Sequence, residues 1–221
     1  MEVTALAHIL PHDTDLLLLD LDNTLYEYNR CHEFALSKLI AACEDAFNLP
    51  AEQVHQLYYE CRKTVSHIHT GTANSHSRLF YIQGMVEKAL GYTNVAQVVY
   101  LHQIYWNSYI IHMELYDDAI AFLQQYKEAN IPVVMVTDML ASVQFQKIDK
   151  LGIGSYFNYI VTSEEAGVEK PHPYIFELAI NKALQLNPGI RRIAVVGDNI
   201  KKDTYSSSVY QVTIYHILRD E

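Results

Sequence analysis

The chain has 221 residues, of which half are hydrophobic and 19% are charged, so it can bury a sizeable core and is not a disordered protein. Its length suits one large domain, or a core domain with a smaller companion. The formal net charge of −10 argues against nonspecific nucleic-acid binding, although a bound cation would still allow an anionic substrate inside one cleft.

The N-terminal segment and the cysteines indicate a soluble protein of the cytoplasm. Residues 1–15 lack a basic region followed by a long apolar run, so we expect no signal peptide. The aliphatic run Leu16–Leu19 is far too short to span a bilayer, and we expect no membrane partner. Widely spaced cysteines are typical of a reducing compartment, and the chain has three: Cys31, Cys43 and Cys61.

The first predicted element is a buried strand over residues 16–20, which is short and continuously apolar. A long segment follows, residues 27–115, in which apolar residues recur at helical spacing. It is too long and too periodic to be a loop. We therefore predict a subdomain of about four helices, inserted into a core that comprises residues 1–26 and 116–221.

From residue 117 onward, helical and strand patterns alternate. Helical patterns cover residues 117–130, 142–152 and 172–189, and strands rich in β-branched residues cover 131–138, 156–163, 192–198 and 211–217. Alternating strands and helices favour parallel pairing. The predicted fold class is α/β: a Rossmann-like three-layer core with a parallel sheet, plus an inserted all-helical domain.

Several polar residues fall where the predicted strands end or the next helix begins: Asp20, Asp22, Thr137, Asp138, Lys170, Asp198 and Asp203. Taken singly, each is typical of a helix cap, a turn or a solvated surface. Taken together, they converge on one edge of the sheet if the strands are parallel. Clustered carboxylates repel one another, and a divalent cation with oxygen ligands would hold them together.

Four segments resemble the motifs of the haloacid dehalogenase-like (HAD) hydrolases. They are "DLDNTL" at 20–25, "VVMVTD" at 133–138, "EKPHPYIF" at 169–176 and "VVGDNIKKD" at 195–203. The segments follow the family's order and span the whole core, and the helical insertion resembles the family's C1-type cap. The resemblance implies an α/β hydrolase with a cap.

The resemblance also implies a role for each motif residue. Asp20 would be the nucleophile that forms an aspartyl phosphate, and Asp22 would be the general acid and base. Thr137 would bind a phosphoryl oxygen, helped by the backbone N–H of Asp138. Lys170 would pair with Asp20 and the transferring group.

The cofactor implied by the resemblance is Mg²⁺. Its ligands would be a carboxylate oxygen of Asp20, the backbone carbonyl of Asp22 and the side chain of Asp198. Asp203 would support this metal site by orienting the metal's waters or Lys170.

Asp22 favours phosphate chemistry over carbon–halogen chemistry, because the dehalogenase branch of the family lacks this second aspartate. We predict a phosphatase that acts on a small phosphorylated metabolite, such as a sugar phosphate or a nucleoside monophosphate. The alternatives are a phosphomutase of the same fold and a catalytically idle binding protein. The sequence leaves open whether the protein is a monomer or a homodimer.

Two positions depart from the family pattern. Many relatives have a small neutral residue where this chain has Asp138, and a carboxylate there would repel phosphate, so we expect its side chain to turn away. A Gly-Ala pair that usually follows the last motif is replaced by Ser206 and Ser207, which are small enough to preserve helix packing.

The insertion contains a polar, histidine-rich segment, Ser66–Tyr81. Its histidines have no acidic partner and no sustained ligand spacing, so a surface loop explains them better than a metal site. If the segment faces the active site, Arg78 would bind a second anionic or hydroxyl-rich part of the substrate. Tyr100, Tyr105, Trp106 and Tyr109 are more typical of a helical core or a partner interface than of base stacking.

Overall fold

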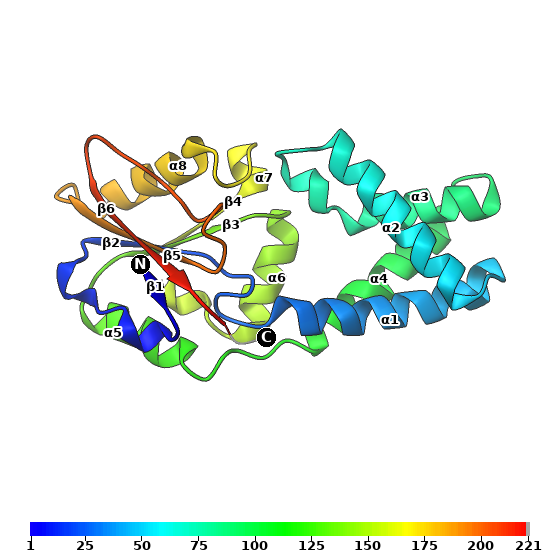
Figure 1. Ribbon diagram of the computed structural model, residues 1–221, viewed down its shortest axis with the longest axis horizontal. Helices are drawn as coiled ribbons and strands as arrows, with labels where there is room; N and C mark the ends of the chain where they lie inside the picture. The colour runs from blue at the N-terminus through cyan, green and yellow to red at the C-terminus, as the bar shows by residue number, and fades with distance from the viewer. Residues whose placement is uncertain (220–221) are drawn as a thin grey trace. The chain divides into compact units, whose positions relative to one another are not determined.

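The computed structural model describes residues 1–219 and divides the chain into two compact units (Figure 1). The first, here called the α/β unit, comprises Met1–Glu27 and the chain from Glu114 onward. The second, here called the helical unit, comprises Tyr28–Met113. Each unit is described below by itself.

The α/β unit is built on a six-stranded sheet in which every pairing is parallel. The strands are β1 (Glu2–Val3), β2 (Leu16–Leu19), β3 (Val133–Thr137), β4 (Tyr159–Thr162), β5 (Arg192–Gly197) and β6 (Gln211–Ile217). Their order is β1-β6-β5-β2-β3-β4, so β2 lies between β5 and β3. This confirms the α/β fold with a parallel sheet that the alternating pattern predicted.

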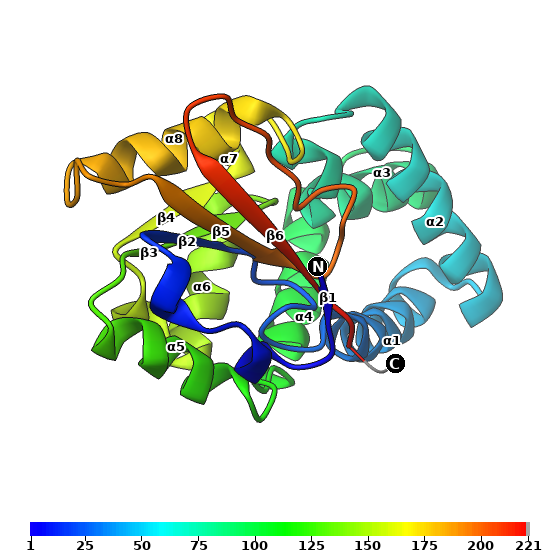
Figure 2. The ribbon, with the colours of Figure 1, turned by 60° about the vertical axis from the view of Figure 1, so that its left-hand side comes forward.

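Helices cover both faces of the sheet, as two views of the α/β unit show (Figures 1 and 2). On one face lie α7 (Ser163–Ala166) and α8 (Pro173–Leu184), and on the other lie α5 (Ala119–Glu128) and α6 (Ala141–Leu151). All four residues of β2 are buried, because a strand in the middle of a covered parallel sheet meets apolar side chains on both sides. Leu16 and Leu18 belong to the same apolar cluster as Phe176 and Ile180 of α8.

The helical unit contains α1 (Tyr28–Phe47), α2 (Ala51–Ile68), α3 (Arg78–Leu90) and α4 (Val95–Ile111). Helix α1 packs chiefly against α4, and α2 packs against α3. Within residues 1–219, none of the helices is both long and apolar enough to cross a lipid bilayer.

Several element boundaries differ from the sequence-based prediction. The strand β1 and the short helix α7 were not predicted, and α8 ends at Leu184 although the helical pattern extended to residue 189. Asp118 was predicted within a helix, but α5 begins after it; its carboxylate accepts a hydrogen bond from the Leu6 N–H (2.8 Å) and one from Arg219 (3.0 Å). The segment Ser66–Tyr81 is only partly a loop, because α2 continues to Ile68 and α3 starts at Arg78.

Candidate active site

The carboxyl edge of the sheet gathers the polar residues that follow β2, β3 and β5. Asp20 comes directly after β2 and Asp198 directly after β5, while Thr137 is the last residue of β3. The backbone hydrogen bonds between β2 and β5 continue to this edge, where the Asp20 N–H donates to the carbonyl of Val196 (2.9 Å). Because β2 is flanked by β3 and β5, these three strand ends are neighbours.

Lys170 connects two of the acidic residues. Its ammonium group lies 2.6 Å from Oδ1 of Asp20 and 2.5 Å from Oδ1 of Asp203. The other oxygen of Asp20 accepts a hydrogen bond from the Thr24 hydroxyl (2.9 Å). Lys170 and Asp20 are only 5% and 7% exposed, so this is a buried charge cluster. Burial alone would lower the pKa of Lys170, but the charges of Asp20 and Asp203 outweigh it and raise that pKa.

Gly197 makes room for Asp203. A Cβ atom built on Gly197 would lie 2.1 Å from Oδ2 of Asp203, which is far inside van der Waals contact. The same Oδ2 accepts a hydrogen bond from the Asn199 N–H (3.0 Å). Glycine at the end of β5 therefore allows the Asp203 carboxylate to lie directly against the strand backbone and beside Lys170.

Three carboxylates form a group that can hold a metal ion. Asp20, Asp198 and Asp203 each offer one oxygen, and these atoms all lie within 4.8 Å of one another. Burial, and then the charge of Asp203, raise the pKa of Asp198 to about 6. Burial likewise raises the pKa of Asp20 well above its ordinary value, against the opposing charge of Lys170. Carboxylates that resist ionisation in the absence of a cation, with oxygen as the only donor atom, fit a hard divalent cation such as Mg²⁺.

Asp22 points to a different set of partners from those of Asp20. Its Oδ1 accepts hydrogen bonds from Lys147 (2.7 Å) and from the Tyr26 hydroxyl, and its Oδ2 accepts one from Gln144 (3.3 Å). Burial by itself would raise the pKa of Asp22, but the adjacent Lys147 ammonium outweighs burial and lowers it. Each carboxylate of the "DLD" segment thus has its own buried lysine, but the pKa values of the two are shifted in opposite directions.

Thr137 and Asp138 lie at the end of β3. The Thr137 side chain is fully buried, and its hydroxyl accepts a hydrogen bond from Gln144. The Asp138 carboxylate accepts hydrogen bonds from the Lys170 N–H (2.9 Å) and from the Lys202 ammonium (2.8 Å). Both carboxylate oxygens of Asp138 therefore accept hydrogen bonds from the protein.

Arg78 belongs to the helical unit. It is only 4% exposed, and its guanidinium donates to the hydroxyls of Tyr28 and Tyr105 and to the carbonyl of His76. The rings of Tyr105 and Trp106 lie 5.7 Å from the guanidinium carbon. Within residues 1–219, no carboxylate forms an ion pair with Arg78.

The remaining sequence-based expectations concern the histidines and the serines. Within residues 1–219, His67, His69 and His76 do not belong to any group of three potential metal ligands. Ser207 lies in the turn before β6, where its hydroxyl accepts hydrogen bonds from the backbone N–H groups of Val209 and Tyr210.

Sequence reasoning missed four residues that shape the site: Thr24, Gln144, Lys147 and Gly197. Gln144 and Lys147 did leave a signal, because they are polar residues three apart on the same face of α6 as the apolar Val143 and Ile148. All four of these α6 residues are buried. Polar side chains on the buried face of a helix require partners in the interior.

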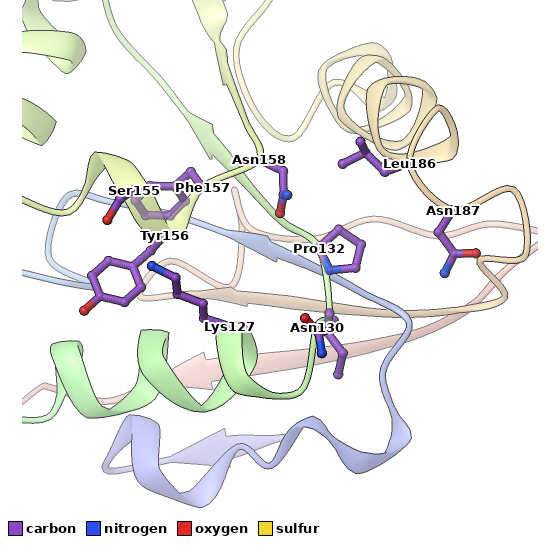
Figure 3. Close-up of a pocket in the computed structure, with 10 residues that line it drawn as sticks. Lys127, Asn130, Pro132, Ser155, Tyr156, Phe157, Asn158, Leu186 and Asn187 are labelled. Carbon is purple, nitrogen blue, oxygen red and sulfur yellow. The ribbon is translucent and has the colours of Figure 1, made fainter.

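A separate cavity of about 470 Å³ lies at the opposite edge of the sheet (Figure 3). Its lining includes residues that precede strands or follow helices, among them Pro132 before β3, Asn158 before β4 and Asn187 after α8. None of the residues at the carboxyl edge lines it. The candidate active site is therefore the carboxyl edge and not this cavity.

Comparison with known proteins identifies the family of the chain. The model of the haloacid dehalogenase-like hydrolases matches residues 14–204. The chain is 29% identical to the ribulose-1,5-bisphosphate 5-phosphatase of Halopiger xanaduensis, over 85% of this chain and 77% of the relative. It is 30% identical to the glyceraldehyde 3-phosphate phosphatase of Methanopyrus kandleri, over 85% and 76%.

Solved structures share the fold. A HAD phosphatase from Thermococcus onnurineus aligns with a TM-score of 0.66 at 16% identity, covering 91% of this chain and 93% of that one. A 2-haloacid dehalogenase from Pseudomonas syringae aligns with a TM-score of 0.62 at 19% identity, covering 86% and 80%. The family match spans all four motifs and the carboxyl edge that they build. The chain belongs to the haloacid dehalogenase-like hydrolases.

Proposed function

We propose that this protein is a Mg²⁺-dependent phosphatase that hydrolyses a small phosphorylated metabolite through an aspartyl phosphate on Asp20. The observation that carries the proposal is the pair of carboxylates, Asp20 and Asp22, at one strand end, each hydrogen-bonded to a different buried lysine. The family and its phosphatase relatives make the chain a hydrolase of phosphoric monoesters. Two relatives are named for phosphorylated sugars, which favours a sugar phosphate over a nucleoside monophosphate.

The metal site fits the acidic group described above. The carboxylates of Asp20 and Asp198, with the backbone carbonyl of Asp22, would hold Mg²⁺, and Asp203 would support it. When bound, the cation supplies charge neutralisation for the phosphate and for the clustered carboxylates. Lys170 contributes a fixed positive charge beside Asp20.

The first half of the reaction transfers the phosphoryl group to the protein. A carboxylate oxygen of Asp20 forms a bond to phosphorus while the bond between phosphorus and the ester oxygen breaks. Asp22 gives a proton to that departing oxygen, so that an alcohol leaves rather than an alkoxide. Thr137 and the Asp138 N–H hold the phosphoryl oxygens, and Lys170 offsets their charge.

The second half regenerates the protein. Asp22, now a carboxylate, takes a proton from water as the water oxygen attacks phosphorus. The bond between phosphorus and Asp20 breaks, and inorganic phosphate leaves.

The experiment that tests this function is a phosphate-release assay over a panel of phosphorylated metabolites at fixed Mg²⁺. We expect release that EDTA abolishes and Mg²⁺ restores, and we expect Asp20→Asn to be inactive because an amide is a far weaker nucleophile. Full activity of Asp20→Asn would overturn the mechanism. Isomerised phosphoester without free phosphate would indicate the phosphomutase alternative, and no turnover of any kind would indicate an idle binding protein.

We propose further that the helical unit acts as the cap and that Arg78 binds a second anionic group of the substrate. A buried guanidinium without a carboxylate partner is costly, and an anionic ligand would compensate its charge. The relative from Halopiger xanaduensis is named for a bisphosphate, which has a second anionic group of this kind.

The role of Arg78 predicts a selective effect on substrate binding. Arg78→Ala should raise KM for the best substrate of the panel by about tenfold or more and leave KM for p-nitrophenyl phosphate nearly unchanged. Arg62→Ala, which removes an exposed arginine from the same unit, is the matched control and should change neither. Equal losses on both substrates with Arg78→Ala would show that Arg78 only holds the tyrosine cluster together.

We also propose a cytoplasmic location, which three buried cysteines suit, and a small-molecule substrate as the main partner. A monomer and a homodimer are equally compatible with this function.

A further inference from the structure

Helix α6 places a lysine in the interior of the α/β unit. Lys147 has no exposed surface, although lysine is rarely buried completely. Its ammonium lies 2.7 Å from Oδ1 of Asp22 and 5.7 Å from the centre of the Tyr26 ring. The family motifs that identified the site do not include this residue, and the reaction steps above do not use it.

The two oxygens of Asp22 have unequal surroundings. Oδ1 accepts hydrogen bonds from both Lys147 and the Tyr26 hydroxyl, and both donors come from fully buried residues. Within residues 1–219, Oδ2 accepts a single hydrogen bond, which comes from Gln144 (3.3 Å). Oδ1 is therefore anchored by the protein, and Oδ2 is the oxygen that remains available for proton transfer.

Gln144 connects this anchored carboxylate to the end of β3. Its amide nitrogen lies within hydrogen-bonding distance of the Thr137 hydroxyl and 3.0 Å from the carbonyl of Asp138. Gln144 is one helical turn before Lys147, so both side chains leave the same face of α6. Helix α6 thus holds the proposed proton-transfer group and the proposed phosphate-binding residue in one arrangement.

A purely structural role explains these contacts less well. Replacing a buried ion pair by apolar residues of similar volume is often neutral or stabilising, so a buried lysine is weak evidence for stability. Lys147 and Asp22 are separated by 125 positions in the sequence, and the lysine meets the second aspartate of the catalytic segment rather than a carboxylate elsewhere in the core.

We propose that Lys147 is a positioning residue, which fixes Asp22 so that Oδ2 faces the departing ester oxygen. This inference rests on the proposed function, in which Asp22 donates a proton as the phosphorus–oxygen bond breaks. The proton moves from Oδ2 to the leaving oxygen, and Lys147 keeps its own protons throughout. Lys147 touches neither phosphorus nor the leaving group and acts through Asp22.

The test compares two substrates that differ in their need for a proton. An alkyl phosphate such as glycerol phosphate has a poor leaving group that requires protonation, whereas p-nitrophenyl phosphate releases a stable phenolate. The parameter to measure is kcat/KM, because it includes expulsion of the leaving group but not the later hydrolysis of the intermediate. Lys147→Met removes the ammonium and keeps the volume; Lys150→Met removes an exposed lysine from the same helix and is the control.

We expect Lys147→Met to lower kcat/KM for the alkyl phosphate by about tenfold or more, and for p-nitrophenyl phosphate by less than about threefold. Lys147→Arg, which keeps a cationic donor, should recover part of the loss. Lys150→Met should match the wild type. In an Asp22→Asn background, Lys147→Met should cause no further selective loss, because the group that it positions is already absent.

Equal losses on both substrates, no selective loss, or a gain with the alkyl phosphate would each overturn the inference. So would full additivity of Lys147→Met and Asp22→Asn. Thermal melts establish that each variant is folded, and Lys147→Gln carries the same comparison if Lys147→Met does not fold. These outcomes differ from failure of the proposed function, in which the wild-type protein itself releases no phosphate.

Discussion

At the scale of single residues, the site depends on side chains that keep like charges close together. Lys170 lies between Asp20 and Asp203, and all three are nearly excluded from solvent. Breaking such a buried pair by removing one partner is strongly destabilising because it leaves a charge without compensation. The positions of Asp20 and Asp203 are therefore not independent of each other.

Gly197 gives the sharpest prediction about this arrangement. In Gly197→Ala, the new methyl group would collide with the Asp203 carboxylate and push it away from Lys170. We expect a loss of about tenfold or more in kcat, with a folded protein, because misplacing a site residue by about an ångström is costly. Steady-state kinetics and a thermal melt check this. Gly154→Ala is the control, because the nearest heavy atom to its new Cβ lies at 3.7 Å. Wild-type activity in Gly197→Ala would contradict the account.

The sequence was informative about residues that sit at strand ends. Asp20, Thr137 and Asp198 could be located because parallel strands bring their carboxyl ends to one edge. Lys147 could not be assigned to Asp22, because its position depends on how α6 packs against a loop 125 residues away. Arg78 was predicted to bind substrate if its segment faces the active site, but its burial among tyrosines follows from packing that periodicity does not reveal.

At the scale of elements, β2 is the strand that positions the proposed catalytic aspartates. Its four leucines have modest strand propensity, but they are buried on both faces of a covered parallel sheet. The strands with β-branched residues were predicted to within three residues of their observed ends, and β6 was predicted at its observed bounds. The strand β1 was missed because two residues carry no periodicity, and its pairing with β6 joins opposite ends of the chain.

Leu18 tests the contribution of β2. It lies in the apolar cluster under α8 and is 1% exposed, so Leu18→Ala should lower the free energy of unfolding by about 2–5 kcal/mol. Leu186→Ala, at a side chain that is 51% exposed, should cost less than about 1 kcal/mol. Urea unfolding monitored by circular dichroism measures both. Similar values for the two variants would show that β2 is not central to the stability of the α/β unit.

At the scale of the whole molecule, the fold brings Asp20, Asp198 and Asp203 together at one edge of the sheet. The net charge of −10 argued against nonspecific nucleic-acid binding but could not locate this edge. The fold class, the order of the motifs and the helical insertion were predictable because they follow from chain order. The natural substrate was not, since the surroundings of Arg78, which we propose to bind it, are set by tertiary packing.

The acidic edge predicts how stability depends on pH without metal. The pKa of Asp198 is about 6 in the folded protein against an ordinary value of 3.8. The folded state therefore binds this proton more tightly than the unfolded state, and this group lowers stability as pH rises from about 4 to about 6. In EDTA, Asp198→Asn should melt about 2–6 °C above the wild type at pH 7, and this difference should vanish near pH 3.5. A lower melting temperature for the variant at pH 7 would contradict the assigned direction of the shift.

The central claim is that Asp20 carries the phosphoryl group during turnover, and trapping that intermediate tests it most directly. The protein is mixed rapidly with substrate and Mg²⁺, quenched in acid and treated with borohydride, which reduces an acyl phosphate to an alcohol. Peptide mass spectrometry then locates the modified residue. We predict homoserine at position 20, with Asp22 and Asp198 unchanged. Turnover of substrate with Asp20 unmodified, or modification at another aspartate, would contradict the account.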